Sequence, residues 1–306
     1  MTKINRRTIL KTGTSALSMP LIGCIPNVAT AQGSEISLNA NLVTVGNSLI
    51  DQSVDMVHFF SSNYGRGSGA LTHQTIPGAP FQWNWDRANQ ASTNAKAALQ
   101  RGGQDIFMGV ESVPFRHVQA PGDVCSITAW KDWYDLAIGN GVTQFFVFEA
   151  WPDLQSGSPD YVPEDRADPD THIPWRERNS FSRQFYMKMV DYVNTRRGNG
   201  PPANLVPGGA MFGQIYDDMA AGRAPDGLNA IQDLFLDTIH PNTSGRYAMA
   251  CLMYACLFRR NPYGMPVRTA NIHGTFYDRV PPRQAAYFQA LAWEMANAEP
   301  TSGLSG

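Results

Sequence analysis

The chain has 306 residues, of which 43% are hydrophobic, and its 24 basic and 26 acidic side chains give a net charge of −2. This composition suffices for one sizeable core and excludes the strongly basic class of nucleic-acid-binding proteins. Residues 1–31 carry four basic and no acidic side chains, so the remainder has 20 basic and 26 acidic groups, a net charge of −6. We therefore expect a mildly acidic domain without a nucleic-acid partner, which does not fit a membrane-surface binder.

The N-terminus is typical of an export signal. A twin arginine at 6–7 precedes a modest apolar stretch over 14–25, and small residues stand before residue 32. We expect residues 1–31 to be a twin-arginine signal peptide and the mature protein to be periplasmic or secreted. The segment 21–24 resembles a lipoprotein cleavage box, so lipidation at Cys24 would instead tether the protein to a membrane. Otherwise we expect no membrane insertion after processing.

Strand-like apolar runs then alternate with helical patterns. The strand-like runs cover 42–45, 106–110 and 144–148. The helical patterns cover 53–60, 89–100, 181–193, 244–260 and 284–295. This alternation predicts an α/β fold, a three-layer α/β/α sandwich with a mainly parallel sheet. We assign the domain to residues 34–298 and regard 299–306 as a flexible tail.

One long segment interrupts the alternation. Residues 153–179 are rich in Pro, Asp, Ser and Arg and almost lack aliphatic side chains, which predicts a loop. Loops of this length in compact domains are often lids or binding loops. A lid or substrate wall and a plain surface insertion are equally consistent with the composition.

A serine follows the first strand-like run on a tight turn, since residues 45–49 read VGNSL. In an open α/β sheet the carboxyl ends of the strands border the crevice in which ligands bind, so Ser48 is a candidate nucleophile. Its hydroxyl needs a neighbouring base to react. Ser48 could alternatively cap the helix that follows it.

Residues 237–242 read DTIHPN and supply a candidate base. Asp237 lies three residues before His240, near enough on a loop to orient the imidazole while its other nitrogen faces a serine. Both side chains could also be metal ligands, but no clear third ligand accompanies them. We therefore expect neither a metal nor a cofactor. The other five histidines have no acid or nucleophile in a comparable context.

The two segments together resemble the first and last blocks of the SGNH (GDSL-type) hydrolases. Residues 46–49 read GNSL where GDSL is commonest, and 237–242 match the last block in full. The resemblance covers most of residues 38–260, with its specific matches at the two ends. It implies a triad of Ser48, His240 and Asp237 that cleaves esters through an acyl-enzyme.

The resemblance also implies donors for the oxyanion of the tetrahedral intermediate. The Ser48 backbone N–H is one, and Gly78, in the turn after the next strand, is the natural second. The family places an asparagine after a further strand, but this chain has Glu111 there, and an ionised carboxylate donates no hydrogen bond. Glu111 is then protonated, or Asn84 or Ser112 replaces it, or the oxyanion hole has two donors.

Tryptophans gather in the loops that this architecture places over the serine, and Trp175 flanks the long segment. Indole faces stack on sugar rings, although tryptophans more often pack in cores. The candidate substrate contacts are Trp83, Trp85, Glu111, Glu149 and Trp151.

We expect a small-molecule or saccharide ester as substrate, with a short acyl group, chiefly acetyl. Two alternatives remain: an acyltransferase on the same fold, and a non-catalytic carbohydrate-binding protein on a decayed hydrolase scaffold.

Three further cysteines follow Cys24. Cys251 and Cys256 are five residues apart on a predicted helix, so they point in different directions. A bridge from Cys125 to one of them could form after export, and buried thiols are the default expectation.

Overall fold

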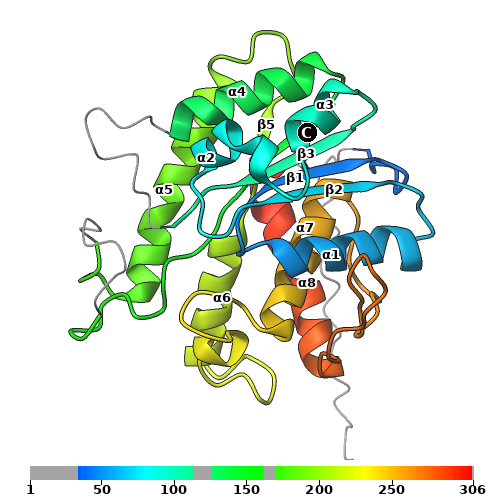
Figure 1. The fold of residues 1–306 in the computed structure, drawn as a ribbon. Coiled ribbons are helices and arrows are strands. Elements are labelled where there is room, and N and C mark those ends of the chain that lie inside the picture. The colour runs from blue at the N-terminus through cyan, green and yellow to red at the C-terminus, as the bar shows by residue number, and fades with distance from the viewer. Residues whose placement is uncertain (1–33, 114–125, 162–169, 305–306) are drawn as a thin grey trace, which may run out of the picture. The chain divides into compact units, whose positions relative to one another are not determined.

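The computed structural model describes residues 34–113, 126–161 and 170–304. The predicted signal peptide with Cys24, and also Cys125, lie outside the described residues. The centre of the domain is a five-stranded sheet in which all neighbours are parallel, with the order β2-β1-β3-β4-β5 (Figure 1). This is the strand order of flavodoxin-like sheets, and the predicted fold class is confirmed.

The strands are β1 (Leu42–Gly46), β2 (Leu71–Thr75), β3 (Ile106–Val110), β4 (Gln144–Phe148) and β5 (Ala203–Val206). The α-helices are α1 (Asp51–Phe59), α2 (Phe81–Asp86), α3 (Ala95–Gln100), α4 (Ser126–Gly139), α5 (Trp175–Asn194), α6 (Gly208–Ala220), α7 (Thr243–Phe258) and α8 (Pro282–Ala298). Short π- or 3₁₀-helical turns are η1 (Phe60–Tyr64), η2 (Ala88–Gln90) and η3 (Ile231–Leu234). None of the helices in the described ranges is long and apolar enough to cross a membrane.

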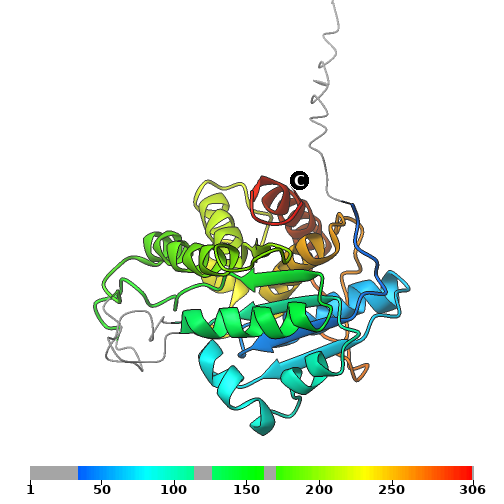
Figure 2. The same cartoon turned by 90° about the horizontal axis from the view of Figure 1, so that it is seen from above.

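Helices cover both faces of the sheet. Helices α1, α6, α7 and α8 lie on one face, and α2, α3 and α4 lie on the other (Figure 2). Helix α5 runs beside β5, between α4 and α6. The fold therefore has three layers, with the sheet between two layers of helices. Successive side chains along each strand point to opposite faces of the sheet.

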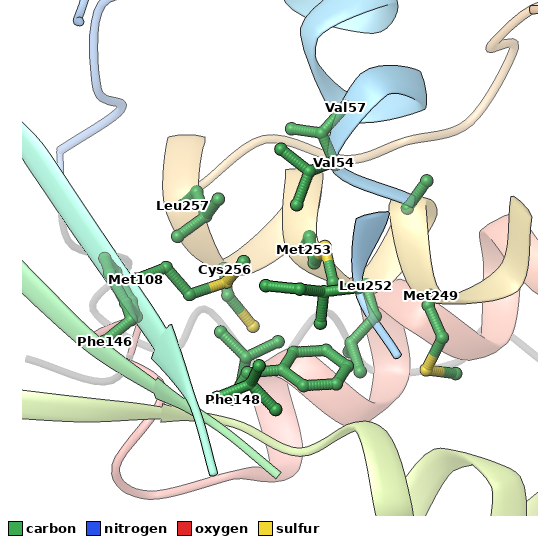
Figure 3. Packing of buried hydrophobic residues seen from close by; sticks show 14 of the residues in the cluster. Val54, Val57, Met108, Phe146, Phe148, Met249, Leu252, Met253, Cys256 and Leu257 are labelled. Carbon is green, nitrogen blue, oxygen red and sulfur yellow. The ribbon is translucent and has the colours of Figure 1, made fainter. Parts of the chain in front are cut away.

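Alternation along the strands divides the core into two halves. Met108 of β3 and Phe146 and Phe148 of β4 point to the side of α1 and α7, where Figure 3 shows them among aliphatic and sulfur-containing side chains. Phe107 and Phe145 point to the opposite side and stack with ring centroids 4.8 Å apart. That second half is aromatic, because the tryptophans and a tyrosine of α4 pack on these rings.

Gly46 ends β1 where a side chain has no room. A Cβ added there would lie 2.1 Å from Cγ1 of Val110 at the end of β3. The missing side chain lets the carboxyl ends of the two strands lie close together, directly before the turn that carries Ser48.

Two predicted boundaries are wrong. The long loop ends at Pro174, because Trp175 begins α5. The tail is not free of the domain: the Thr301 carbonyl accepts a hydrogen bond of 2.8 Å from the Leu205 N–H of β5, and Leu304 is buried. The described part of the tail, 299–304, is thus packed against the edge of the sheet.

Cys251 and Cys256 are both buried free thiols on α7. Burial raises the pKa of each, so both stay protonated and unreactive near neutral pH.

Candidate active site

Ser48, His240 and Asp237 lie together at the carboxyl end of the sheet, although almost two hundred residues separate the serine from the other two. Ser48 Oγ is 2.9 Å from His240 Nε2, and His240 Nδ1 is 2.8 Å from Asp237 Oδ2. With Nδ1–H donating to the carboxylate, Nε2 accepts the serine hydroxyl proton. The structure thus brings the three predicted residues into one hydrogen-bonded chain.

The turn around Ser48 is fixed by Asn47. The Asn47 Oδ1 accepts a hydrogen bond from the Leu49 N–H at 3.2 Å, and its Nδ2 donates to the Glu111 carbonyl at 3.3 Å. Asn47 and Leu49 are buried, whereas Ser48 between them is partly exposed. Ser48 does not cap α1, because the N-cap position belongs to Ile50.

The carboxylate of Asp237 holds both its own loop and the imidazole. Its Oδ1 accepts hydrogen bonds from the backbone N–H groups of Ile239 and His240 at 2.8 and 2.7 Å. Partial burial acts to raise the pKa of Asp237, but these two bonds and the imidazole outweigh it and hold that pKa below its ordinary value. Asp237 is therefore ionised at neutral pH, as an orienting carboxylate must be.

A second loop, residues 151–154 after β4, holds the loop with His240 in place. The Trp151 indole N–H donates to the Ile239 carbonyl at 2.9 Å. The Thr238 hydroxyl donates to Asp153 at 2.7 Å, and the Leu154 N–H donates to the Thr238 carbonyl at 2.7 Å. No local sequence pattern indicates this support.

The start of α7 anchors the same loop from its other end. Asn242 is the N-cap, and its Oδ1 accepts hydrogen bonds from the N–H groups of Ser244 and Gly245. A Cβ on Gly245 would lie 2.4 Å from the Leu234 carbonyl oxygen, so the helix can pack this closely only with glycine there.

The two predicted backbone donors for an oxyanion have no hydrogen-bond partner within the described residues. They are the N–H groups of Ser48 and Gly78. Gly78 has φ +65° in a turn closed by the Ala79 N–H and the Ile76 carbonyl at 3.1 Å, after Pro77. A type II turn needs positive φ at this position. Their use as oxyanion donors stays a prediction.

The predicted roles of two polar residues are wrong. Asn84 is fully buried, and its Oδ1 accepts a hydrogen bond from Gln74, so its amide faces the interior rather than an oxyanion. Glu111 is also buried, and its Oε1 accepts the backbone N–H groups of Phe81 and Ser112 at 2.9 Å each. Glu111 fastens the start of α2 to the end of β3 and is not a substrate contact.

Only one of the predicted aromatic contacts is exposed. Trp83 is 41% exposed, with the Arg87 guanidinium 4.3 Å from its ring centroid. Trp85 is half-buried against Trp133. Trp151 is fully buried, so its prediction as a substrate contact is wrong: the loop after β4 turns its side chain inward to pack on α6. Trp175 is buried as well.

Glu149 belongs to a buried ion-pair network rather than to a substrate cleft, which corrects its predicted role. Its Oε2 lies 2.6 Å from Nη1 of Arg183, which also pairs with Glu299. Glu299 accepts hydrogen bonds from Thr301 in the C-terminal segment. Burial raises the pKa of Glu149 to about 7, although the Arg183 charge opposes this.

His73 has an acidic partner that sequence reasoning missed. Its Nε2 is 3.1 Å from Asp51 Oδ1, and its Nδ1 is 2.6 Å from Thr44 Oγ1. Thr75 donates to the same Asp51 oxygen at 2.6 Å. These bonds join β1 and β2 to the first residue of α1. In the described ranges no three His, Cys, Asp or Glu side chains gather closely enough to hold a metal ion.

Comparisons with known proteins rest on structure. No protein-family model matches the chain, and no curated protein matches its sequence. A DUF4886 family protein from Bacteroides uniformis superposes with a TM-score of 0.58 at 14% identity, over 86% of this chain and 96% of that one. At this identity the likeness concerns the fold alone.

Two further solved structures are more distant. A protein from Slackia heliotrinireducens, described provisionally as an SGNH hydrolase, has a TM-score of 0.40 at 16% identity, over 69% of this chain and 95% of that one. A gut microbial diltiazem-metabolizing enzyme has a TM-score of 0.40 at 13% identity, over 78% of this chain and 50% of that one. TM-scores below 0.5 do not define a shared fold.

We predict that Trp151→Phe loosens the loop that carries His240. The Ile239 carbonyl loses its buried donor, which costs about 1–3 kcal/mol and lowers Tm by a few degrees. Esterase kcat should also fall about three- to tenfold, because a small misplacement of the imidazole weakens proton transfer. Trp133→Phe is the matched control, since its indole N–H has no partner among the described residues. Equal kcat values for both variants would contradict the positioning role.

We predict that Glu149→Gln changes how stability depends on pH. The folded protein holds the Glu149 proton more tightly than the unfolded chain, so the free energy of unfolding falls as pH rises from 4.5 to about 7. The total is about 3 kcal/mol. The Glu149→Gln variant has no such pH-dependent decrease. Its free energy of unfolding relative to wild type, measured by urea denaturation, should therefore increase between about pH 4 and about pH 8. Asp226→Asn, at an exposed ion pair, should show no such trend.

Proposed function

We propose that this chain is a serine ester hydrolase of the SGNH type, with Ser48 as nucleophile, His240 as general base and Asp237 as the acid that orients it. The observation that carries the proposal is the hydrogen-bonded chain from Ser48 Oγ through both imidazole nitrogens to Asp237. Its position at the carboxyl end of a parallel sheet, where such folds bind ligands, supports the same function.

In the acylation step, His240 Nε2 takes the Ser48 hydroxyl proton while Oγ bonds to the carbonyl carbon of the ester. The negative charge passes to the carbonyl oxygen, within reach of the proposed backbone donors at Ser48 and Gly78. The tetrahedral intermediate collapses as the bond to the alcohol oxygen breaks, and the alcohol leaves with the proton from His240. Asp237 stabilises the imidazolium meanwhile.

In the deacylation step, His240 removes a proton from water, whose oxygen attacks the acyl carbon. The bond from this carbon to Ser48 Oγ then breaks, His240 returns the proton to Oγ, and the acid leaves. A sugar hydroxyl in place of water would make the protein an acyltransferase by the same chemistry. Product analysis with an acceptor sugar separates the two. The non-catalytic alternative loses support, because a binding protein has no need for an aligned serine, imidazole and carboxylate.

We further propose a short acyl group, chiefly acetyl, and a periplasmic or secreted location. The residues on both sides of Ser48 are buried, as are Glu111 and Ser112 after the end of β3, and this burial supports a small acyl site. The location rests on the sequence of residues 1–31. Trp151 and Trp175 are buried and so give no support to a saccharide substrate, for which the argument depends instead on polar groups beside Ser48.

We predict that Ser48→Ala and His240→Ala each lower kcat/KM on 4-nitrophenyl acetate by roughly 10³-fold or more, and that the double variant loses little further. Asp237→Asn should keep more activity than either. Ser37→Ala, an exposed serine before β1, serves as the control and should match wild type. Independent, additive losses for the serine and the histidine would argue against a shared mechanism.

We predict that acetyl esters are cleaved with higher kcat/KM than esters of about eight or more acyl carbons, because the proposed small acyl site would exclude the longer chains. A series of 4-nitrophenyl acyl esters measures this preference, with spontaneous hydrolysis subtracted. A steady rise of kcat/KM with chain length would make the protein a lipase-like esterase and refute the proposed acyl preference.

A further inference from the structure

An accessible polar stripe begins at Ser48 and continues along α1. Asp51, Gln52 and Asp55 are partly exposed, whereas Leu49 and the other residues between them are buried. Their spacing of three and four residues places them on one face of the helix, one turn after another from the nucleophile. A substrate bound at Ser48 therefore has this stripe beside it.

Arg246 on α7 reaches the same stripe. Its Nη1 donates a hydrogen bond to Gln52 Oε1. Burial lowers the pKa of Arg246, and the nearby charges of Asp51 and Asp237 act in the opposite direction. The hydrogen bond to Gln52 places the guanidinium beside the first turn of α1.

Among the described residues, most of the N–H groups of Arg246 have no hydrogen-bond acceptor. A guanidinium carries five N–H donors, and the bond to Gln52 uses one. Arg246 forms no ion pair with any of the described residues. Asp51 has spare capacity too, since its Oδ1 takes the bonds from His73 and Thr75 while its Oδ2 has no hydrogen bond within the described ranges.

The balance of charge favours a neutral ligand at this place. Asp51 and Asp237 both interact electrostatically with Arg246, so two carboxylates act on one guanidinium and an anionic ligand would meet net repulsion. A hydroxyl group avoids this cost, because it donates to a carboxylate and accepts from a guanidinium at once. Several hydroxyl groups on neighbouring carbons could bond to the carboxylate, amide and guanidinium groups together.

We infer that Arg246, Gln52 and Asp51 form a subsite for the hydroxyl groups of the alcohol part of the ester, so the preferred substrates are acyl esters of polyhydroxylated compounds such as saccharides. The inference rests on the proposed function, because Ser48 defines which ester lies next to the subsite. Arg246 is then a residue that determines specificity and not a catalytic one.

The test compares an acetylated methyl pentoside with 4-nitrophenyl acetate, which has no hydroxyl groups. Arg246→Gln should lower kcat/KM about tenfold or more on the sugar ester and less than about threefold on the aryl ester, since a hydrogen bond from a charged group is lost only with the sugar. Arg259→Gln is the matched control. It replaces a half-buried arginine of the α7 C-cap that bonds to Gln144, at the amino end of β4, and should change neither value.

Three results would overturn the inference. Equal losses on both esters would mean that Arg246 positions the turn with Ser48 through Gln52. Unchanged kinetics on both would mean that it does not touch the substrate. Preference of the wild type for a carboxylate-bearing acetate ester, lost in Arg246→Gln, would make the subsite an anion site.

A binding measurement separates this inference from the proposed function. Calorimetry of the acetylated pentoside with Ser48→Ala and with Ser48→Ala/Arg246→Gln needs no turnover. Weaker binding by the double variant, about tenfold, supports the subsite even if the wild type hydrolyses neither ester, which would refute only the proposed hydrolysis. Equal affinities would refute the subsite, whatever the activity. Thermal unfolding shows that each variant is folded.

Discussion

The hydrogen bond from the Trp151 indole to the Ile239 carbonyl is the constraint on which the geometry of the site depends. His240 and Asp237 are 35% and 54% exposed in their side chains, so water competes for the bond between them. An exposed ion pair of this kind contributes little stability by itself. The Trp151 ring is buried against Phe212 of α6 and Phe235. Its N–H therefore holds the loop that carries His240 against the rigid core.

The serine is fixed by different means on the opposite side of the site. Asn47 ties its turn to the end of β3, and Asp51 ties the first residue of α1 to β2 through Thr75 and His73. Tyr277 adds a third tie, donating to Asp55 one turn further along α1 at 2.8 Å. Ser48 and His240 are thus positioned by separate parts of the fold, an arrangement that fits the preorganised site required by the proposed catalysis.

Sequence patterns predicted the buried interior well and the rims of the sheet poorly. The strands at 106–110 and 144–148 have the predicted bounds, because uninterrupted apolar runs define strands that are covered on both faces. The edge strand β2 reads LTHQT and β5 has four residues, so neither shows a clear apolar period. The motif predicted which residues meet at Ser48, since two short segments contained all three side chains.

The residues around Ser48, His240 and Asp237 could not be predicted in the same way. Glu149 and Trp151 follow the end of a strand, where alternation no longer says which way a side chain points. Their burial depends on α5 and α6, which come later in the chain and supply Arg183 and Phe212 as partners. The polar cluster of His73 likewise requires the pairing of β2 with β1, which no local pattern indicates.

The packing of the C-terminal segment on β5 bears on how the protein behaves toward its own copies. An outer strand with unpaired backbone groups and apolar side chains is a template for intermolecular pairing. β5 is the outer strand on this side of the sheet, and its four residues are buried and mostly apolar. The Thr301 carbonyl occupies the outward N–H of Leu205, and the turn that follows lies over the strand. Because of this packing, the Leu205 N–H is not available to pair with a strand of another copy.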